Sequence, residues 1–567
     1  MGESKSKPLR VKTEPIALDT FGGRIYVEWD PAATVTPLGQ LPFFIDWLNT
    51  IGAFDAFVAD CPLKYNSNNG SSVRAVLATL MVSILGGHQR YAHISAMRCD
   101  GVHPALLGIN KFVSEDAARR ALKMMDETAA IAWLDRHLAK TTAPLLTAPW
   151  ILDLDATVKC LYGEQEGAVA GYNPTKPGRP SHSYHSGFMA NTRLAIHVDV
   201  LAGNQSAPSH SMGLIWSLIE GLPAVQRPTL LRGDVAFGNE PVMAKAEALG
   251  QHYLTKLRLT SKVQLLIDKL FQTGAWTDAG QGWEGAESTL MLAGWSKQRR
   301  VVVLRRKRPE TAQITDLQGE ATVLVGADKS LSKTIGATAT ANSTQQAIKA
   351  TKTSKAAKAT KATKATKATK ANKKNASSKG RGKGAAQQQF AFLEDGSPVA
   401  RYEYAVLITS TDYDIPALAQ LYRDRADVEN NFDELKNQWG WGGYTTSDIK
   451  RCRIIARMVA LIYNWWTLFV RTAQPQKHFE AITSRPLLLH ATAVQTKHAG
   501  QTTLIITSTH AKQEKIQAVL TNLAAFLRQL KTTAEQLTDA QRWHAIMQRA
   551  FGHFMMTAPK PQALLMI

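Results

Sequence analysis

Four chemically active side chains recur at helical spacing within residues 421–436. Tyr422, Arg425, Glu429 and Lys436 lie at offsets of 0, 3, 7 and 14, so on one α-helix they would fall within an arc of about 60°. A carboxylate can hold a divalent metal ion and the two cations can bind phosphate, which suits phosphodiester chemistry. The same spacing also fits a solvated helix face with ion pairs such as that of Arg425 with Glu429.

A single helix is expected to carry these four residues. Asp414 is a suitable N-cap and Pro416 would lie in the first turn. The helix should end near Gly440, Gly442 and Gly443, where glycines alternate with tryptophans. Residues 402–409 form an apolar run that predicts a strand leading into this helix.

Two further acids lie on a predicted strand at residues 149–158. Its apolar residues alternate with Asp153, Asp155 and Thr157, so the two carboxylates share one face. Paired carboxylates are costly to bury without a cation, which favours a metal site. A pair at the end of a strand that faces water is the alternative.

A third acidic position follows the apolar run that begins at residue 228. Asp234 stands at the end of this predicted strand, and a helix is predicted at residues 240–249. Open α/β sheets bind ligands at the carboxyl ends of their strands. Asp234 could equally be a turn or capping residue. Strands near 183–189 and 193–200 and a helix at 211–221 complete this region.

The order Tyr, two residues, Arg, three residues, Glu, six residues, Lys resembles the signature of a large group of bacterial DDE transposases. The downstream run Ile454–Trp466 is similar to the same group. The loop Gly171–His182 resembles that of the insertion sequence 1380 family of transposases. The resemblance extends from about residue 38 to residue 530 and omits one low-complexity segment.

This resemblance implies an α/β fold with a ribonuclease-H-like catalytic core. A β-rich insertion would interrupt the core, with a helical N-terminal DNA-binding region before it and a mostly helical C-terminal region after it. Asp155, Asp234 and Glu429 would be the catalytic acids and would hold two Mg²⁺ ions, with Mn²⁺ able to substitute. Asp153 would be an auxiliary metal ligand, although Asp153 rather than Asp155 could be the first ligand.

The resemblance also implies contacts with DNA. Tyr422, Arg425 and Lys436 would bind phosphates beside the scissile bond, and we expect Lys176 and Arg179 to reach DNA from the upstream loop. In relatives the insertion grips the transposon end, and some of them stack a tryptophan on an extruded base.

The resemblance leaves the roles of several aromatic and basic residues open. Trp283 or Trp295 could stack on a base, although core packing is the commoner fate of a tryptophan. Arg119 and Arg120 lie on a helix predicted to start at Ser114. They could read DNA as part of a helix-turn-helix-like unit, or they could be solvated arginines of a small helical bundle.

These elements divide the chain into six predicted regions. They are a basic N-terminal segment at 1–37, a helical DNA-binding domain at 38–145, the first part of the core at 146–262, the insertion at 263–400, the second part of the core with the Glu429 helix at 401–470, and a C-terminal region at 471–567 with a possible role in protein interaction. Within the insertion, residues 327–388 are rich in Lys, Ala and Thr, lack an apolar face and are predicted to be disordered.

Charge and composition narrow the function further. The chain of 567 residues has a formal net charge of +21, which favours a nucleic acid partner. Its four cysteines form no CxxC pair, which predicts a reducing compartment and no zinc site. No signal peptide or apolar run of about 20 residues is seen, so we expect a cytoplasmic, nucleoid-associated protein without membrane contact. Phosphate-loop, HExxH and GxSxG motifs do not occur, which argues against NTPase, zincin and serine hydrolase functions.

The sequence therefore predicts a transposase. It would bind the terminal inverted repeats of an insertion sequence as a homodimer on double-stranded DNA, cleave the element ends and join their 3′-hydroxyls to target DNA. Two alternatives stay open. One is a ribonuclease-H-like nuclease without strand transfer, and the other is a catalytically silent DNA-binding descendant of a transposase.

Overall fold

A computed structural model describes residues 15–30, 33–65, 70–147, 149–174, 176–308, 398–532 and 536–557. The lysine-rich segment 327–388, predicted to be disordered, lies outside these residues. Among the helices of the described residues, none is long and apolar enough to cross a membrane.

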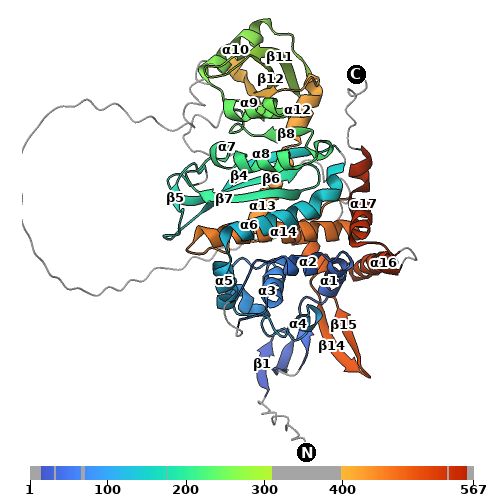
Figure 1. The fold of residues 1–567 in the computed structure, drawn as a ribbon. Helices are drawn as coiled ribbons and strands as arrows, with labels where there is room; N and C mark the ends of the chain where they lie inside the picture. The colour runs from blue at the N-terminus through green and yellow to red at the C-terminus, as the bar shows by residue number, and fades with distance from the viewer. Residues whose placement is uncertain are drawn as a thin grey trace, which may run out of the picture. The chain divides into compact units, whose positions relative to one another are not determined.

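The central element is a mixed sheet of ten strands in the order β10-β11-β12-β13-β9-β8-β4-β6-β5, with β7 paired to β6 (Figure 1). Strand β4 pairs in parallel with β8 and antiparallel with β6. The strands are β4 (Ile151–Cys160), β5 (Val169–Ala170), β6 (Pro180–Met189), β7 (Leu194–Ala202), β8 (Leu230–Gly233), β9 (Tyr253–Lys256), β10 (Thr277–Gly280), β11 (Trp283–Leu290), β12 (Arg299–Lys307) and β13 (Tyr402–Thr409). The mixed α/β architecture agrees with the predicted fold class.

The region expected to interrupt the core begins with a helix and then extends the same sheet. Strands β10, β11 and β12 follow α10 (Ser261–Thr273) and continue the sheet beyond β13. Val302, Leu304 and Leu407 are buried in one core cluster that includes Leu418. The described part of the insertion therefore shares its core with the strands around it, because its apolar strand face is covered by the helix that follows β13.

Long helices pack beside the sheet. Helix α14 (Ile449–Ala473) contacts both β7 and α6 (Glu127–Thr142), and α6 and α14 run side by side in Figure 1. Almost all of α14 is buried, and its Arg457, fully buried, pairs with Asp135 and Asp199. The helices that connect the core strands are α7 (Ala207–His210), α8 (Met212–Gly221) and α9 (Glu240–Ala248).

The N-terminal region is helical, as predicted. Ser72 caps α3 and Ser114 caps α5 through side-chain oxygens that accept from backbone N–H groups. Its main helices are α1 (Leu41–Thr50), α2 (Ala53–Ala59), α3 (Val73–Leu85), α4 (His103–Leu106) and α5 (Glu115–Met124), preceded by the strands β1 (Ile16–Thr20), β2 (Gly23–Val27) and β3 (Val35–Thr36).

The C-terminal region combines helices with a hairpin that pairs with β3. Its elements are α15 (Ala481–Leu488), β14 (Thr492–His498), β15 (Gln501–Thr507), α16 (Gln513–Thr532) and α17 (Asp539–Thr557). The apolar stripe of α16, with Leu520, Leu523 and Leu527 buried, packs within the chain against α1, α14 and α15.

The prediction of one continuous helix from Asp414 to Gly440 is wrong. Asp414 caps a first helix, α12 (Ile415–Arg423), and a second helix, α13 (Ala426–Asn437), follows a turn at Asp424 and Arg425. The N–H of Arg425 bonds the carbonyl of Tyr422, three residues earlier, at 3.3 Å. This tighter turn interrupts the helical repeat, so the predicted common face of Tyr422 with Glu429 and Lys436 does not follow from one helix.

Candidate active site

The two acids of β4 have different surroundings. The side chain of Asp153 is 1% exposed, and both of its oxygens accept from Arg232, at 2.5 Å from Nε and 2.7 Å from Nη2. Asp155, two residues further on, has a side chain that is 13% exposed and pairs with Arg425 at 2.6 Å. The expectation that Asp153 serves as a metal ligand does not fit this structure, because a buried guanidinium occupies both of its oxygens.

Asp155 lies at the centre of a group of acids. Burial raises its pKa to about 6; Arg425 opposes this shift, whereas the nearby charges of Asp234 and Glu429 add to it. Asp234 and Glu429 thus both act electrostatically on Asp155, although the three acids come from β4, from the loop after β8 and from α13. Two unfavourable carboxylate neighbours make this position receptive to a cation.

Asp234 follows directly after β8, as expected for an acid at a strand's carboxyl end. Its Oδ1 accepts from the backbone N–H of Ala236 at 2.9 Å, so it also organises the turn before α9. Tyr422 lies near the same group. Burial raises the pKa of its phenol to about 12, Arg425 opposes the shift, and Asp234, Asp155 and Glu429 reinforce it.

Helix α13 lies along β4 and carries Glu429 in its first turn and Lys436 in its last. Glu429 is exposed, whereas Lys436 is partly buried and its Nζ donates to Oγ1 of Thr157 at 3.2 Å. Burial lowers the pKa of Lys436. Because Thr157 lies two residues beyond Asp155 on β4, α13 places Lys436 beside the strand that carries Asp155.

The donor chemistry of the three acids suits a hard cation. Carboxylate oxygens are the ligands that Mg²⁺ prefers, and a cation would relieve the repulsion at Asp155. Within the described residues, however, no three His, Cys, Asp or Glu side chains form a cluster able to hold a metal ion. The acids share one electrostatic neighbourhood without forming a coordination cluster, and their role as metal ligands stays a prediction.

A family comparison places this arrangement of acids in context. A family model described as a transposase DDE domain matches residues 146–465, more than half of the chain. The chain belongs to this transposase family. The matched DDE domain includes β4, β8 and α13, the three elements that carry Asp155, Asp234 and Glu429.

Two further comparisons add less. Among solved structures, a piggyBac transposase synaptic complex with hairpin DNA is similar with a TM-score of 0.32 and 9% identity, over 91% of this chain and 85% of that one. No curated protein sequence matches the chain.

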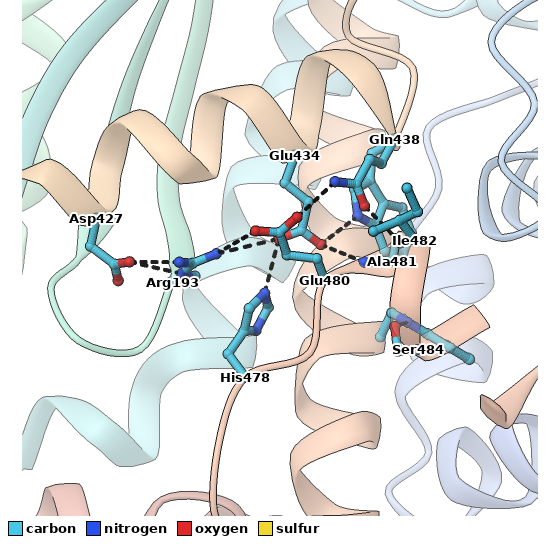
Figure 2. A network of polar contacts seen from close by, with 11 residues as sticks. Arg193, Asp427, Glu434, Gln438, His478, Glu480, Ala481, Ile482 and Ser484 are labelled. Atoms are coloured by element: carbon cyan, nitrogen blue, oxygen red, sulfur yellow. Dashed lines mark hydrogen bonds and ion pairs between the residues drawn. The ribbon is translucent and has the colours of Figure 1, made fainter. Parts of the chain in front are cut away.

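The face of α13 away from the site is anchored by a polar network (Figure 2). Arg193, from the turn between β6 and β7, pairs with Asp427 at 2.7 Å. Glu434 is 1% exposed and accepts from Nε2 of His478 at 2.9 Å and from the N–H of Ala481 at 3.0 Å. These contacts fix both ends of α13, and therefore the backbone that carries Glu429.

Sequence reasoning missed several residues that form ion pairs on or beside the elements carrying Asp155, Asp234 and Glu429. Arg232 and Arg193 were not singled out, and neither was Glu434. The sequence holds one clue to Arg232: it is a charged residue that directly follows the apolar pair Leu230 and Leu231 on the predicted strand before Asp234. No pattern in the sequence links Arg193 to α13, because the two are more than 230 residues apart.

The tryptophans proposed to stack on a base are largely packed in the protein. Trp295 is 9% exposed and lies under the guanidinium of Arg299, at 5.3 Å from ring centroid to Cζ. Trp283 is half-buried against the core of β12 and α12 and lies under Arg306 at 5.0 Å. The alternative of core packing describes Trp295 in this structure, while Trp283 keeps part of its surface exposed.

The predicted basic contacts lie in two surface regions. Lys176 and Arg179 surround Tyr162, with a 2.7 Å hydrogen bond from Lys176 Nζ to the phenol oxygen and the Arg179 guanidinium 4.8 Å from the ring centroid. Arg119 and Arg120 line an open groove of about 790 Å³. Arg119 pairs with Glu115 and Asp116, whereas Arg120 is exposed.

Proposed function

We propose that the chain is a DNA transposase whose catalytic acids are Asp155, Asp234 and Glu429. It would bind the terminal inverted repeats of its own insertion sequence, cleave at the element ends and join the 3′-hydroxyls to target DNA. The observation that carries this proposal is that Asp234 and Glu429 both act electrostatically on Asp155, inside a chain of the transposase DDE family.

The residues of the site suggest separate roles. The three carboxylates would hold Mg²⁺, or Mn²⁺ in its place, which when bound activates an attacking oxygen and stabilises the leaving one. Arg425 lies against Asp155 and would turn its guanidinium to a phosphate when DNA enters. Tyr422 would donate its phenolic proton in a hydrogen bond, since a phenol is protonated at neutral pH and burial raises its pKa further.

Duplex DNA would extend beyond the acids over basic surfaces. Lys436 lies beside β4, and the groove that contains Arg119 and Arg120 would accept a phosphate backbone. The groove is lined by Asp116, Arg119, Arg120, Lys123, Glu164, Gln165, Thr445, Thr446, Ser447 and Arg451. Its four basic residues outnumber its two acidic ones, and its hydroxyl and amide groups are typical of contacts that position DNA without reading sequence. A homodimer would bring two element ends together.

A cleavage assay on DNA that carries the terminal repeats tests the proposal. With Mg²⁺, wild-type protein should nick at the element end and then join the 3′-hydroxyl to a target plasmid. Asp155→Asn and Asp234→Asn should each abolish both steps and preserve end binding, because Asn keeps the shape and removes the charge. Nicking without joining would instead support the nuclease alternative. Binding without either step in wild-type protein would support the silent descendant.

A further inference from the structure

A buried ion pair lies directly behind two of the proposed catalytic acids. Asp153 and Arg232 are each 1% exposed and are direct partners in the parallel pairing of β4 with β8. Each stands two residues before an acid, Asp155 on β4 and Asp234 just after β8. Because side chains alternate along a strand, Asp153 points to the same face of the sheet as Asp155.

The guanidinium of Arg232 also reaches a third segment. While Nε and Nη2 bind the two oxygens of Asp153, Nη1 donates to the backbone carbonyl of Leu421. Leu421 precedes Tyr422 and lies four residues before Arg425, which pairs with Asp155. One side chain thus links β4, β8 and the end of α12. Asp155 lies on β4, Asp234 directly follows β8, and Arg425 lies in the turn after α12.

Helix α13 packs on the same face of the sheet. Phe188 of β6 lies opposite Asp153 in the strand register, and its ring meets Phe432 of α13 edge to face with centroids 5.5 Å apart. The ion pair therefore lies within the layer between the sheet and the α12–α13 unit, beneath Asp155 rather than at the surface.

Net stabilisation alone is a poor explanation for such a pair. Removing two charges from water costs several kcal/mol per ion, and well-packed apolar residues of similar volume often give equal or greater stability. A bidentate pair that also holds a backbone carbonyl supplies directional contacts that apolar side chains cannot supply. Because the pair lies behind Asp155 and Asp234, we attribute its role to these directional contacts rather than to net stabilisation.

We propose that Asp153 and Arg232 are positioning residues that fix the separation of Asp155 and Asp234 and the approach of Arg425. The inference rests on the proposed function of the three acids. Asp153 would act through geometry and would not contact the metal ion, since Arg232 engages both of its oxygens. Partners that orient metal ligands commonly affect metal affinity by 10- to 100-fold.

The test replaces the pair by apolar residues of similar size. Asp153→Leu combined with Arg232→Met should fold, bind element ends and unfold within a few degrees of wild type. Its nicking rate should fall roughly 100-fold, because a misplacement of about 1 Å has that effect on a catalytic group. The Mg²⁺ concentration for half-maximal nicking should rise about tenfold.

A matched control variant and a second measurement distinguish a positioning role of the ion pair from a general contribution to the fold. Arg457→Met combined with Asp199→Leu and Asp135→Asn removes another buried group of ion pairs, on α14, β7 and α6, and should leave the metal dependence of nicking unchanged. Direct Ca²⁺ binding, measured by calorimetry without turnover, should weaken about tenfold only in the Asp153/Arg232 double variant. Asp155→Asn should abolish that Ca²⁺ binding.

Each outcome decides the question. If the double variant keeps wild-type nicking and Ca²⁺ affinity, the pair does not position the acids. If it does not fold, Arg232→Lys provides the decision, since it keeps the charge and loses the bidentate contact. Weakened Ca²⁺ binding in folded Arg232→Lys supports the inference, and unchanged binding overturns it. Wild-type protein that neither binds Ca²⁺ nor nicks DNA would instead overturn the proposed function.

Discussion

The two sides of α13 use the same residue types in opposite ways. Asp427 and Glu434 lie in a network with Arg193, His478 and Glu480, where donors from two other segments bind the carboxylates (Figure 2). Glu429, between them in sequence, is exposed and adds to the charge that raises the pKa of Asp155. The difference teaches that acids whose charged neighbours include other acids, rather than acids as such, mark the candidate site.

The largest expected effect comes from Glu429→Gln. If Glu429 is a catalytic acid, nicking should fall at least about 1,000-fold, equivalent to about 4 kcal/mol of transition-state stabilisation. The midpoint of chemical unfolding should stay near wild type, because Glu429 is exposed and has no buried partner to lose. Steady nicking by the variant would remove Glu429 from the site and leave α13 with a structural role only.

The next effect is a pH dependence specific to Asp155. Its pKa is raised from 3.8 to about 6, so the folded protein binds more protons than the unfolded chain between these pH values. Stability from this group is therefore highest below about pH 4 and is lost as pH rises through 6. Protein in a chelator should lose on the order of 3 kcal/mol across this window relative to Asp155→Asn.

Parallel urea titrations of the two proteins at pH 4, 5, 6 and 7 measure this difference. Arg425→Met supplies the matched control. Because Arg425 opposes the rise in the pKa of Asp155, its removal should raise that pKa further. The loss of stability should then extend to higher pH. Identical pH profiles for wild type and Asp155→Asn would show that folding does not raise the pKa of Asp155 and would weaken the contrast between the two sides of α13.

The opposite side of α13 should respond in stability instead. Glu434→Gln puts an amide NH₂ group among the donors of His478, Trp439 and Ala481. We expect a loss of about 2 to 3 kcal/mol in the free energy of unfolding, since buried donors lose a charged acceptor. Equilibrium unfolding measures this loss. Nicking per folded molecule should change little at low temperature, and a severe catalytic defect in fully folded protein would show that the network belongs to the site.

Local patterns predicted much of this arrangement. The strand at 402–409 and the capped helix after Ser114 follow from apolar periodicity and a capping residue, which are local properties. The order of Asp155, Asp234 and Glu429 could be proposed from strand ends and family resemblance. These features need no knowledge of which distant segments meet.

The remaining features depend on pairing between distant segments. Asp153 and Arg232 are 79 positions apart, and their contact follows from the parallel register of β4 and β8. The turn at Asp424 and Arg425 carries no glycine or proline, so nothing in the local sequence marks the break. It coincides with the contacts of Arg425 to Asp155 and of Arg232 to Leu421, which are tertiary interactions.

The smallest expected effect concerns Lys436, in the last turn of α13. Its Nζ contacts only the hydroxyl of Thr157 among the hydrogen bonds described for it, and burial lowers its pKa. A phosphate at this position would oppose this shift and favour the charged ammonium. Lys436→Gln should therefore reduce the slope of log affinity against log salt by about 0.9, the value for one lost phosphate contact.

Fluorescence anisotropy with end DNA over a range of salt concentrations measures the slope. Lys515→Gln, an exposed lysine of α16, is the matched control and should leave the slope unchanged. Equal slopes for wild type and Lys436→Gln would show that Lys436 makes no phosphate contact. Lys436 would then belong with Asp427 and Glu434 as a residue that holds α13 in place.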